Sequence, residues 1–289
     1  MAITIGLPFY NAEDFLEMAI KSVFAQTYQD WELILMDDGS TDNSLEIAKS
    51  INDPRVSVYS DGKNKKLAAR LNEIVGLAKY EYLARMDADD LMSTKRIETQ
   101  LNILKSNPDL DLVSTGTISI SNDLTYLGCR FADISEISFE DLLYKRAAPT
   151  HASIVSKTDW FKRNQYDETL KIAQDYDLWL RASKKNDFNI RFINDLLYYY
   201  REENNATSKK VLAAYKNERV MYKKYADKQF LPLWFKSQFK SMAVRGISLL
   251  NKEDILLKRR SYKSASDNYN EQVYLNELDR VINTKLPIS

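Results

Sequence analysis

The chain has 289 residues, of which 44% are apolar, and its 41 basic and 41 acidic side chains leave no net charge. A chain of this size can bury a large core without covalent staples, and its single cysteine, Cys129, excludes an intramolecular disulfide. It has no run of about 18 apolar residues and no signal-peptide pattern, so we expect neither a secreted nor an integral membrane protein. A reducing cytoplasm is the expected location.

The first 90 residues alternate between strand-like and helix-like patterns. Runs rich in β-branched and other apolar residues predict strands at 3–8, 31–36, 56–59 and 80–86. Apolar residues at helical spacing predict helices between them at 12–25, 45–51 and 67–78. This alternation is typical of right-handed crossover units, so we expect an α/β fold with a mainly parallel sheet.

The alternation breaks after residue 90, which predicts a second subregion. Helices are expected at 94–105 and 174–185, and strands at 112–115, 117–120, 124–129 and 195–201. The first three of these strands are expected to pair antiparallel. We therefore divide the chain into residues 1–90, residues 91–206 and a helical region at 207–289.

Three polar segments follow strands of the first half, namely Pro8–Asn11, Asp37–Asp42 and Asp87–Asp90. In a parallel sheet, ligands bind beyond the carboxyl ends of the strands. We therefore expect these three segments to meet at one edge of the sheet, although they are about 30 and 50 residues apart in the sequence.

The Asp37–Asp42 segment has two interpretations. It can be a strand-to-helix turn in which Gly39 supplies an unusual backbone angle and a polar side chain caps the next helix. Alternatively, Asp37 or Asp38 accepts a hydrogen bond from the imide N–H of a pyrimidine, which offers one donor between two acceptors.

The acidic segment Asp87–Asp90 is either a solvated turn or a cation site. An unpaired carboxylate is costly to bury, so the cluster has to meet water, a basic partner or a metal ion. Carboxylates together with phosphate oxygens are how proteins hold Mg²⁺ or Mn²⁺ on a diphosphate. Arg85, directly before the cluster, could pair with a neighbouring carboxylate, and Asp90 is expected to cap a following helix.

In their order and spacing, these three segments resemble the motif series of family 2 glycosyltransferases of the GT-A fold. The resemblance covers roughly residues 3–205 and implies a Rossmann-like sheet with helices on both faces. It also implies inverting transfer of a sugar from a nucleotide donor, usually a UDP-sugar, with Mn²⁺ or Mg²⁺ as cofactor.

The resemblance assigns roles position by position. Asp89 would be the principal metal ligand, and Asp87 would be shared between ribose and metal. Lys66, Arg70 and Asn72 would lie near the diphosphate, although a solvated helix face explains the two basic residues equally well. The expected nucleotide-sugar site comprises Pro8, Tyr10, Asn11, Asp37, Asp38, Lys66, Arg70, Asn72, Arg85, Asp87, Ala88 and Arg201.

The catalytic base is expected in the stretch Gln174-Asp175-Tyr176-Asp177. Relatives carry an acidic pair before this helix, and Gln174 replaces its first member. Asp175 is the expected base, because inversion requires a carboxylate that removes the acceptor proton opposite the leaving group. Asp177 is the competitor and would then lie in the acceptor site; alternatively, both acids only favour the positive end of a helix.

His151, the only histidine, lies where relatives often place one. It could line the acceptor site or reach the metal, or it could be structural. Arg201 follows three tyrosines, and the resemblance makes it a bidentate clamp for the diphosphate.

Positive charge is concentrated near the C-terminus. Residues 209–263 hold 15 Lys and Arg against four Asp and Glu, whereas residues 1–208 hold 24 against 33. The aromatic residues between these basic ones could pack onto the core as a helical cover, or the region could lie on an anionic membrane surface. Nucleic acid is not an expected partner, because no recognised binding motif accompanies the charge.

The sequence thus predicts a metal-dependent, inverting glycosyltransferase that acts on a glycan acceptor, with a lipid-linked saccharide at the inner membrane face as the expected one. A nucleotidyltransferase is one alternative, but it should carry a glycine-rich phosphate loop, and residues 7–11 contain no glycine. The other alternative is a non-catalytic module that binds sugar nucleotides or glycans, which the replacement at Gln174 would explain. The sequence does not indicate an oligomeric state.

Overall fold

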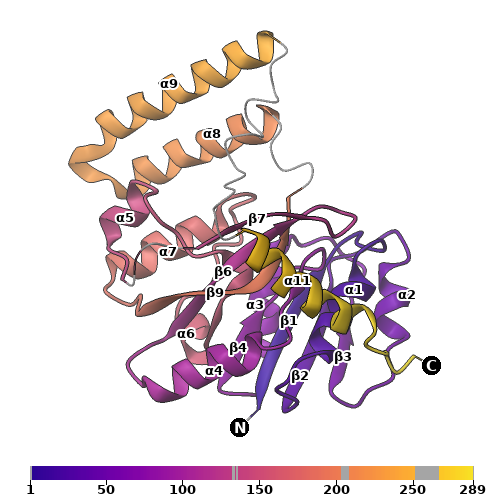
Figure 1. The fold of residues 1–289 in the computed structure, drawn as a ribbon. Helices are drawn as coiled ribbons and strands as arrows, with labels where there is room; N and C mark the ends of the chain where they lie inside the picture. Colours follow the sequence, from indigo (N-terminus) through magenta and orange to yellow (C-terminus); the bar gives the residue numbers. More distant parts are fainter. Residues whose placement is uncertain (1, 132–133, 135, 203–207, 251–266, 289) are drawn as a thin grey trace.

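One mixed sheet of nine strands carries the fold and has helices on both faces (Figure 1). The computed structural model describes residues 2–131, 134, 136–202, 208–250 and 267–288. The order of the strands is β3 (Val56–Tyr59), β2 (Trp31–Asp37), β1 (Ile3–Phe9), β4 (Tyr82–Arg85), β8 (Val155–Lys157), β6 (Leu112–Ile120), β9 (Ile190–Arg201) and β5 (Leu91–Met92), and β7 (Tyr126–Arg130) pairs with β6.

The four strands β1 to β4 are parallel, as the alternating pattern predicts. Consecutive side chains of β2 enter different cores, because successive residues of a strand point to opposite faces. Leu33 and Leu35 join a cluster with helices α1 (Leu16–Phe24), α2 (Ser44–Lys49) and α4 (Arg96–Ser106). Ile34 and Met36 face the opposite cluster, which includes α3 (Leu67–Leu77), α5 (Phe139–Leu143), α6 (Thr158–Arg163) and α7 (Gln174–Lys184).

Two glycines are required by this arrangement. A Cβ on Gly6 would lie 2.5 Å from Cγ2 of Ile74, so glycine lets α3 approach β1 closely. Gly39 has a φ of +74°, which confirms the unusual backbone angle expected between β2 and α2.

Several expectations beyond residue 90 are wrong in detail. The segments 112–115 and 117–120 form one strand, β6, whose register with β9 shifts around Gly116. β9 begins at Ile190, earlier than expected, and it pairs parallel to β6, whereas β7 pairs antiparallel to β6 as predicted. Asp90 caps no helix, because the strand β5 follows it directly. The halves 1–90 and 91–206 share one continuous sheet.

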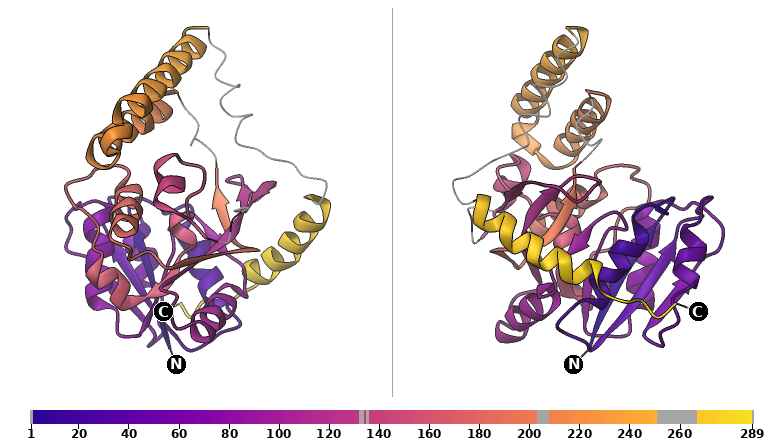
Figure 2. Two further views of the ribbon diagram at one scale, coloured as in Figure 1. Left: turned by 90° about the vertical axis from the view of Figure 1, so that its left-hand side faces the viewer. Right: turned by 45° about the vertical axis from the view of Figure 1, so that its right-hand side comes forward.

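The C-terminal region splits into two parts (Figures 1 and 2). Helices α8 (Ser208–Tyr225) and α9 (Phe230–Leu249), joined by the short helix η2 (Asp227–Gln229), form a hairpin that projects from the α/β body. Helix α11 (Asp267–Ile282) returns to the body and packs on α1 and β7. Across the described ranges, every helix is too short or too polar to cross a bilayer.

Helix α11 is fixed to the body by a buried carboxylate. Oε2 of Glu277 accepts hydrogen bonds from the Ser93 hydroxyl at 3.2 Å and from the Thr94 backbone N–H at 2.9 Å. Tyr274, one turn earlier, is fully buried and donates its hydroxyl to the carbonyl of Leu124 at 2.8 Å. The last helix is therefore an integral part of the fold.

Replacing Glu277 by alanine is expected to lower the free energy of unfolding by about 2 kcal/mol, because three buried donors, the Ser93 hydroxyl and the N–H and hydroxyl of Thr94, lose their acceptor. Urea unfolding followed by circular dichroism measures this loss. The matched control is Gln272→Ala on the exposed side of the same helix, which should change the free energy by less than about 0.5 kcal/mol. Equal losses in both variants would contradict the anchoring role of Glu277.

Candidate active site

The three polar segments meet at the carboxyl edge of the parallel strands. The backbone N–H of Asp38 donates to the carbonyl of Phe9 at 2.8 Å, and that of Met86 donates to the carbonyl of Gly6 at 3.1 Å. Asn11 links the first two segments, because its side-chain oxygen accepts a hydrogen bond from the N–H of Thr41 at 2.8 Å. The expected convergence of these segments is therefore found.

Asp37 and Asp38 are buried and held by protein donors. Asp37 accepts hydrogen bonds from the Ser40 N–H at 2.9 Å and from the Ser60 hydroxyl at 2.6 Å. Asp38 accepts from the Lys65 N–H at 2.7 Å and from Nε of Arg70 at 3.0 Å. Both carboxylates thus organise the loops that border the edge, and their direct contact with a base stays a prediction.

Tyr10 has 49% of its surface exposed beside them, while Pro8 is buried within β1.

Residues of strand β9 hold the acidic loop 87–90 in place through hydrogen bonds. The carboxylate of Asp90 is buried and accepts hydrogen bonds from the Tyr198 hydroxyl at 2.8 Å and from the Arg201 N–H at 2.9 Å. The N–H of Asp87 donates to the Tyr198 hydroxyl at 3.1 Å, and Nε of Arg201 donates to the carbonyl of Asp89. Ala88, between them, is buried. Of these three acids, only Asp89 has an exposed side chain.

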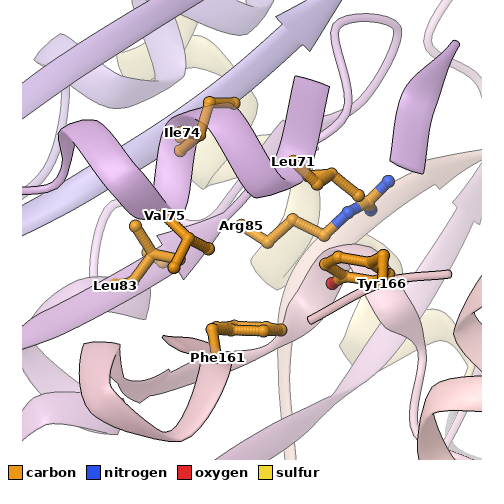
Figure 3. A pocket seen from close by; sticks show the side chains of 9 residues that line it. Leu71, Ile74, Val75, Leu83, Arg85, Phe161 and Tyr166 are labelled. Atoms are coloured by element: carbon orange, nitrogen blue, oxygen red, sulfur yellow. The ribbon is translucent and has the colours of Figure 1, made fainter. Parts of the chain in front are cut away.

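Arg85 pairs with Asp87, which is one of the two roles open to it. Its two terminal nitrogens lie 3.0 and 2.5 Å from the two carboxylate oxygens of Asp87. The stem of Arg85 borders a small cavity of about 10 Å³, together with Leu71, Phe161 and Tyr166 (Figure 3). This buried fork fixes the orientation of Asp87 and leaves Asp89 as the least constrained acid.

A divalent cation fits the acidic loop. Carboxylate oxygens of Asp87, Asp89 and Asp90 lie within 4.8 Å of one another. Desolvation and the neighbouring Asp87 charge raise the pKa of Asp89, and desolvation raises the pKa of Asp90 further. A bound cation would relieve this repulsion, and hard oxygen donors of this kind are what Mg²⁺ and Mn²⁺ prefer.

A cleft of about 500 Å³ opens beside this loop. It brings Asp87 and Arg85 together with residues that lie more than 40 positions later in the chain, namely Arg130, His151, Lys171, Gln174, Asp175, Tyr200 and Glu202. The cleft is large enough for part of a sugar nucleotide or a glycan. The expected acceptor-side residue His151 and the expected base Asp175 thus share one cleft with the acidic loop.

Asp175 lies in the first turn of α7, at the edge of the cleft. Ala173, directly before the helix, has a φ of +63°, a left-handed conformation that turns the chain sharply into α7. Oε1 of the adjacent Gln174 is buried and finds no hydrogen-bond partner among the described residues. A buried oxygen without a partner in the cleft wall is typical of a position that contacts a ligand or water.

Asp177 lies away from this cleft, so its expected place in the acceptor site is not found. Its carboxylate is completely buried and accepts hydrogen bonds at 2.7 Å from both Nζ of Lys224 and the hydroxyl of Tyr225. Burial and the Asp177 carboxylate raise the pKa of Tyr225 to about 12. Asp177 therefore anchors α8 onto α7.

His151 lies in the short helix η1 (His151–Ser153) and shares a 2.7 Å hydrogen bond from Nε2 with the hydroxyl of Tyr166. Its ring also packs edge-on against Trp179, with ring centroids 5.8 Å apart. Burial, and secondarily the charge of Arg85, hold the pKa of His151 well below its usual range. The imidazole is therefore neutral at pH 7.

Of the three residues expected at the diphosphate, Arg70 and Asn72 bind other parts of the protein. Arg70 is buried among Asp38, Asp61 and Glu73, with nitrogen–oxygen distances of 3.0, 2.6 and 2.7 Å. The side chain of Lys66 is exposed. Asn72 joins α3 to the backbone of Tyr166 through hydrogen bonds of 3.1 and 2.9 Å.

Arg201 also holds protein groups in this structure. Its guanidinium donates to the carbonyls of Ser121 and Asn122 at 3.0 and 2.7 Å, as well as to that of Asp89. It therefore braces the acidic loop from behind, and the role of a diphosphate clamp stays a prediction.

Some residues of the cleft are not marked by any sequence pattern. Arg130 ends β7 and forms an ion pair with Glu202, which follows β9, across 72 positions of the chain. A second hollow of about 410 Å³ adjoins the cleft, since Arg130 and Thr150 line both, and Arg146 lines the second. The two hollows therefore adjoin at Arg130 and Thr150, and Asp175 lines the first of them.

Comparison with known protein families identifies the class of protein. The family model described as glycosyl transferase family 2 matches residues 4–170 of the chain, which is more than half of its length. The protein belongs to this family, and it is a glycosyltransferase with a GT-A type fold. Family membership favours neither the nucleotidyltransferase nor the non-catalytic module.

Individual relatives agree with this assignment. The chain is 30% identical over 210 residues to the putative glycosyltransferase EpsE of Bacillus subtilis (strain 168), covering 71% of this chain and 74% of that one. It is 28% identical over 192 residues to the Escherichia coli enzyme named UDP-Glc:alpha-D-GlcNAc-diphosphoundecaprenol beta-1,3-glucosyltransferase WfgD, covering 66% and 73%. The structure of S. aureus TarS 1–349 in complex with UDP-GlcNAc shares the fold, with a TM-score of 0.62 at 16% identity over 98% of this chain and 82% of that chain.

Asp175 and Asp177 are expected to respond differently to the same substitution. Asp177→Asn should lower the free energy of unfolding by about 2 kcal/mol, because the buried carboxylate that accepts from Lys224 and Tyr225 loses its charge. Asp175→Asn, at a partly exposed position two residues earlier, should change it by less than about 0.5 kcal/mol. Thermal and urea unfolding of both variants measure the difference, and a stable Asp177→Asn protein would contradict the anchoring role.

His151 is expected to make stability fall on acidification. Its pKa is lowered in the folded state, so below the unfolded pKa of about 6.5 only the unfolded chain binds the proton. Between pH 7.5 and 5.5 the wild type should lose about 1.4 kcal/mol more stability than His151→Gln. Because the chain has one histidine, the variant removes all histidine titration. Parallel stability curves for the two proteins would refute the lowered pKa.

Proposed function

We propose that this glycosyltransferase moves a sugar from a UDP-sugar to a hydroxyl of a glycan acceptor, with inversion at the anomeric carbon. The observation that carries the proposal is a single cleft that holds Asp87 of the acidic loop on one side and Asp175 on another. A site of this kind supplies both requirements of the reaction, a binding place for the charged leaving group and a base for the attacking hydroxyl.

The donor would bind along the carboxyl edge of the parallel strands. The exposed ring of Tyr10 lies there beside Asp37 and Asp38, in a position to stack on a base. The TarS structure named above contains UDP-GlcNAc on the same fold, which supports a UDP-sugar as donor. The diphosphate would then extend toward Asp87 and Asp89.

We propose that Asp89 is the principal ligand of a divalent cation, Mn²⁺ or Mg²⁺, with Asp87 as a second ligand. Such a cation, when bound, offsets the negative charge that develops on the departing diphosphate. Arg85 keeps the Asp87 carboxylate turned toward the site, and Asp90 and Arg201 hold the loop in place from behind. The framework contacts thus leave Asp89 as the exposed acid.

Asp175 would act as the general base. The acceptor oxygen attacks the anomeric carbon from the face opposite the diphosphate, and its proton passes to the Asp175 carboxylate as the new bond forms. The bond between that carbon and the phosphate oxygen breaks, and UDP leaves with the electron pair. The neutral Gln174 beside Asp175 could donate its amide to the acceptor, while His151, also neutral, would line the acceptor side.

A lipid-linked saccharide in surface polysaccharide synthesis is the proposed acceptor. The second hollow adjoins the cleft that holds Asp175 and offers room for a glycan, and it presents Arg130 and Arg146 to an anionic group such as a lipid diphosphate. The name of the E. coli relative specifies a diphosphoundecaprenol acceptor. Such an enzyme would work in the cytoplasm, at the inner face of the cell membrane.

Release of UDP from a panel of UDP-sugars tests the proposal. Activity with at least one donor should require Mn²⁺ or Mg²⁺ and disappear with a chelator. Asp89→Ala and Asp175→Asn should each lower the rate of transfer by about 100-fold or more, because one loses charge stabilisation and the other the base. The control is Asp109→Ala, an exposed acid after α4, which should keep the wild-type rate. Full activity in the chelator, or in Asp89→Ala, would reject the metal site.

A further inference from the structure

Helix α9 carries a continuous apolar face that points to solvent. Leu231, Phe235, Phe239, Met242 and Leu249 are exposed over 61%, 53%, 68%, 63% and 85% of their surfaces. Their spacing of 4, 4, 3 and 7 residues follows the helical repeat, so all five lie on one side, which we call the outer face of α9. An uninterrupted apolar face of this size is unusual on a soluble monomer and marks an interaction surface.

The opposite side of α9 is already used by α8. Leu233 and Val244 are buried there, and Arg219 of α8 donates to the hydroxyls of Ser237 and Ser241 at 3.3 and 2.9 Å. Helix α9 therefore packs one side on α8 through apolar and polar contacts and turns its outer face to solvent. Packing within the hairpin explains the first side but not the outer face.

Basic residues flank the outer face. At 100° per residue, Lys236 lies beyond one edge and Arg245 beyond the other, and both are exposed. Residues 209–263 as a whole hold 15 basic against four acidic side chains. A second copy of the chain would bring the same positive charge against itself, which opposes self-association. The occupant that matches the outer face is both apolar and anionic, as the interfacial layer of a lipid bilayer is.

The hairpin formed by α8 and α9 lies on the same side of the body as the cleft. Figures 1 and 2 show α8 and α9 on the side of the body toward which β1 runs, the side where the three polar segments meet. Helix α7 links the two, because it begins with Gln174 and Asp175 and holds α8 through Asp177. A bilayer that binds α9 would thus lie on the cleft side of the enzyme.

We infer that the outer face of α9 inserts into an anionic membrane surface and presents the cleft to acceptors held in that surface. Its five apolar side chains would enter the boundary between head groups and acyl chains, with Lys236 and Arg245 reaching lipid phosphates. The insertion stands on the exposure and charge of α9 alone. Only the purpose given to it, delivery of a lipid-linked acceptor, rests on the proposed function.

Co-sedimentation with vesicles tests this inference on the whole chain. Wild type should bind vesicles of phosphatidylcholine with 25% phosphatidylglycerol and bind phosphatidylcholine alone far less. The triple variant Phe235→Ser, Phe239→Ser, Met242→Ser should bind about 100-fold more weakly, since three large apolar side chains no longer enter the bilayer. Lys236→Gln with Arg245→Gln should weaken binding about tenfold or more in low salt and much less in high salt.

A matched triple variant on α11, Val273→Ser, Leu275→Ser and Ile282→Ser, removes exposed apolar groups outside α9 and should bind vesicles as wild type does. Donor hydrolysis without vesicles should be unchanged in both triple variants, which separates this test from that of the proposed function. If the wild type does not hydrolyse any donor, the proposed function is rejected, but the membrane insertion of α9 is not. Wild type that fails to sediment with anionic vesicles, or an α9 variant that binds normally, would overturn the inference. So would light scattering showing that the α9 variant only converts a dimer to a monomer.

Discussion

The buried carboxylate of Asp90 is the constraint on which the site depends. Placing an acid in the interior is costly, and here desolvation and two neighbouring carboxylates raise its pKa well above the usual range. The Tyr198 hydroxyl and the Arg201 N–H offset part of that cost, and both come from strand β9, more than 100 residues later. By occupying these donors, Asp90 fixes the short loop before it. Asp87 can then face the cleft and Asp89 can stay exposed, while their neighbour Asp90 faces the core.

The buried arginine Arg96 connects this part of the site to the second half of the chain. Arg96, at the start of α4, donates to the carbonyls of Arg85, Ala152 and Ile154 at 2.9, 3.1 and 3.2 Å, and burial lowers its pKa to about 10. It therefore joins the end of β4, which precedes the acidic loop, to the segment that begins with His151. The two sides of the cleft are held together by backbone acceptors around one guanidinium, not by packing alone.

The sequence predicts those parts of the molecule that depend on local pattern. The parallel strands, the turn at Gly39 and the meeting of three polar segments follow from periodicity and from the geometry of crossover units. The pairing of β6 with β9 and the ion pair between Arg130 and Glu202 depend on distant segments that no local pattern connects. Asp177 shows the same limit, because its carboxylate resembles that of Asp175 in sequence and differs only in what covers it.

Helix α8 covers Asp177, and this contact shows that the basic, aromatic region has a part that packs on the core and a part that does not. Tyr222 and Tyr225 of α8 are buried, so there the expectation of aromatic residues packing onto the core holds. On α9, Phe230 also packs against the core, whereas Phe235 and Phe239 point outward and do not. Helix α8 is held at Asp177, two residues beyond Asp175, and the Tyr144 hydroxyl donates to Gln229 of η2. Because both contacts lie on the side of the hairpin that meets the body, they leave the outer face of α9 uncovered.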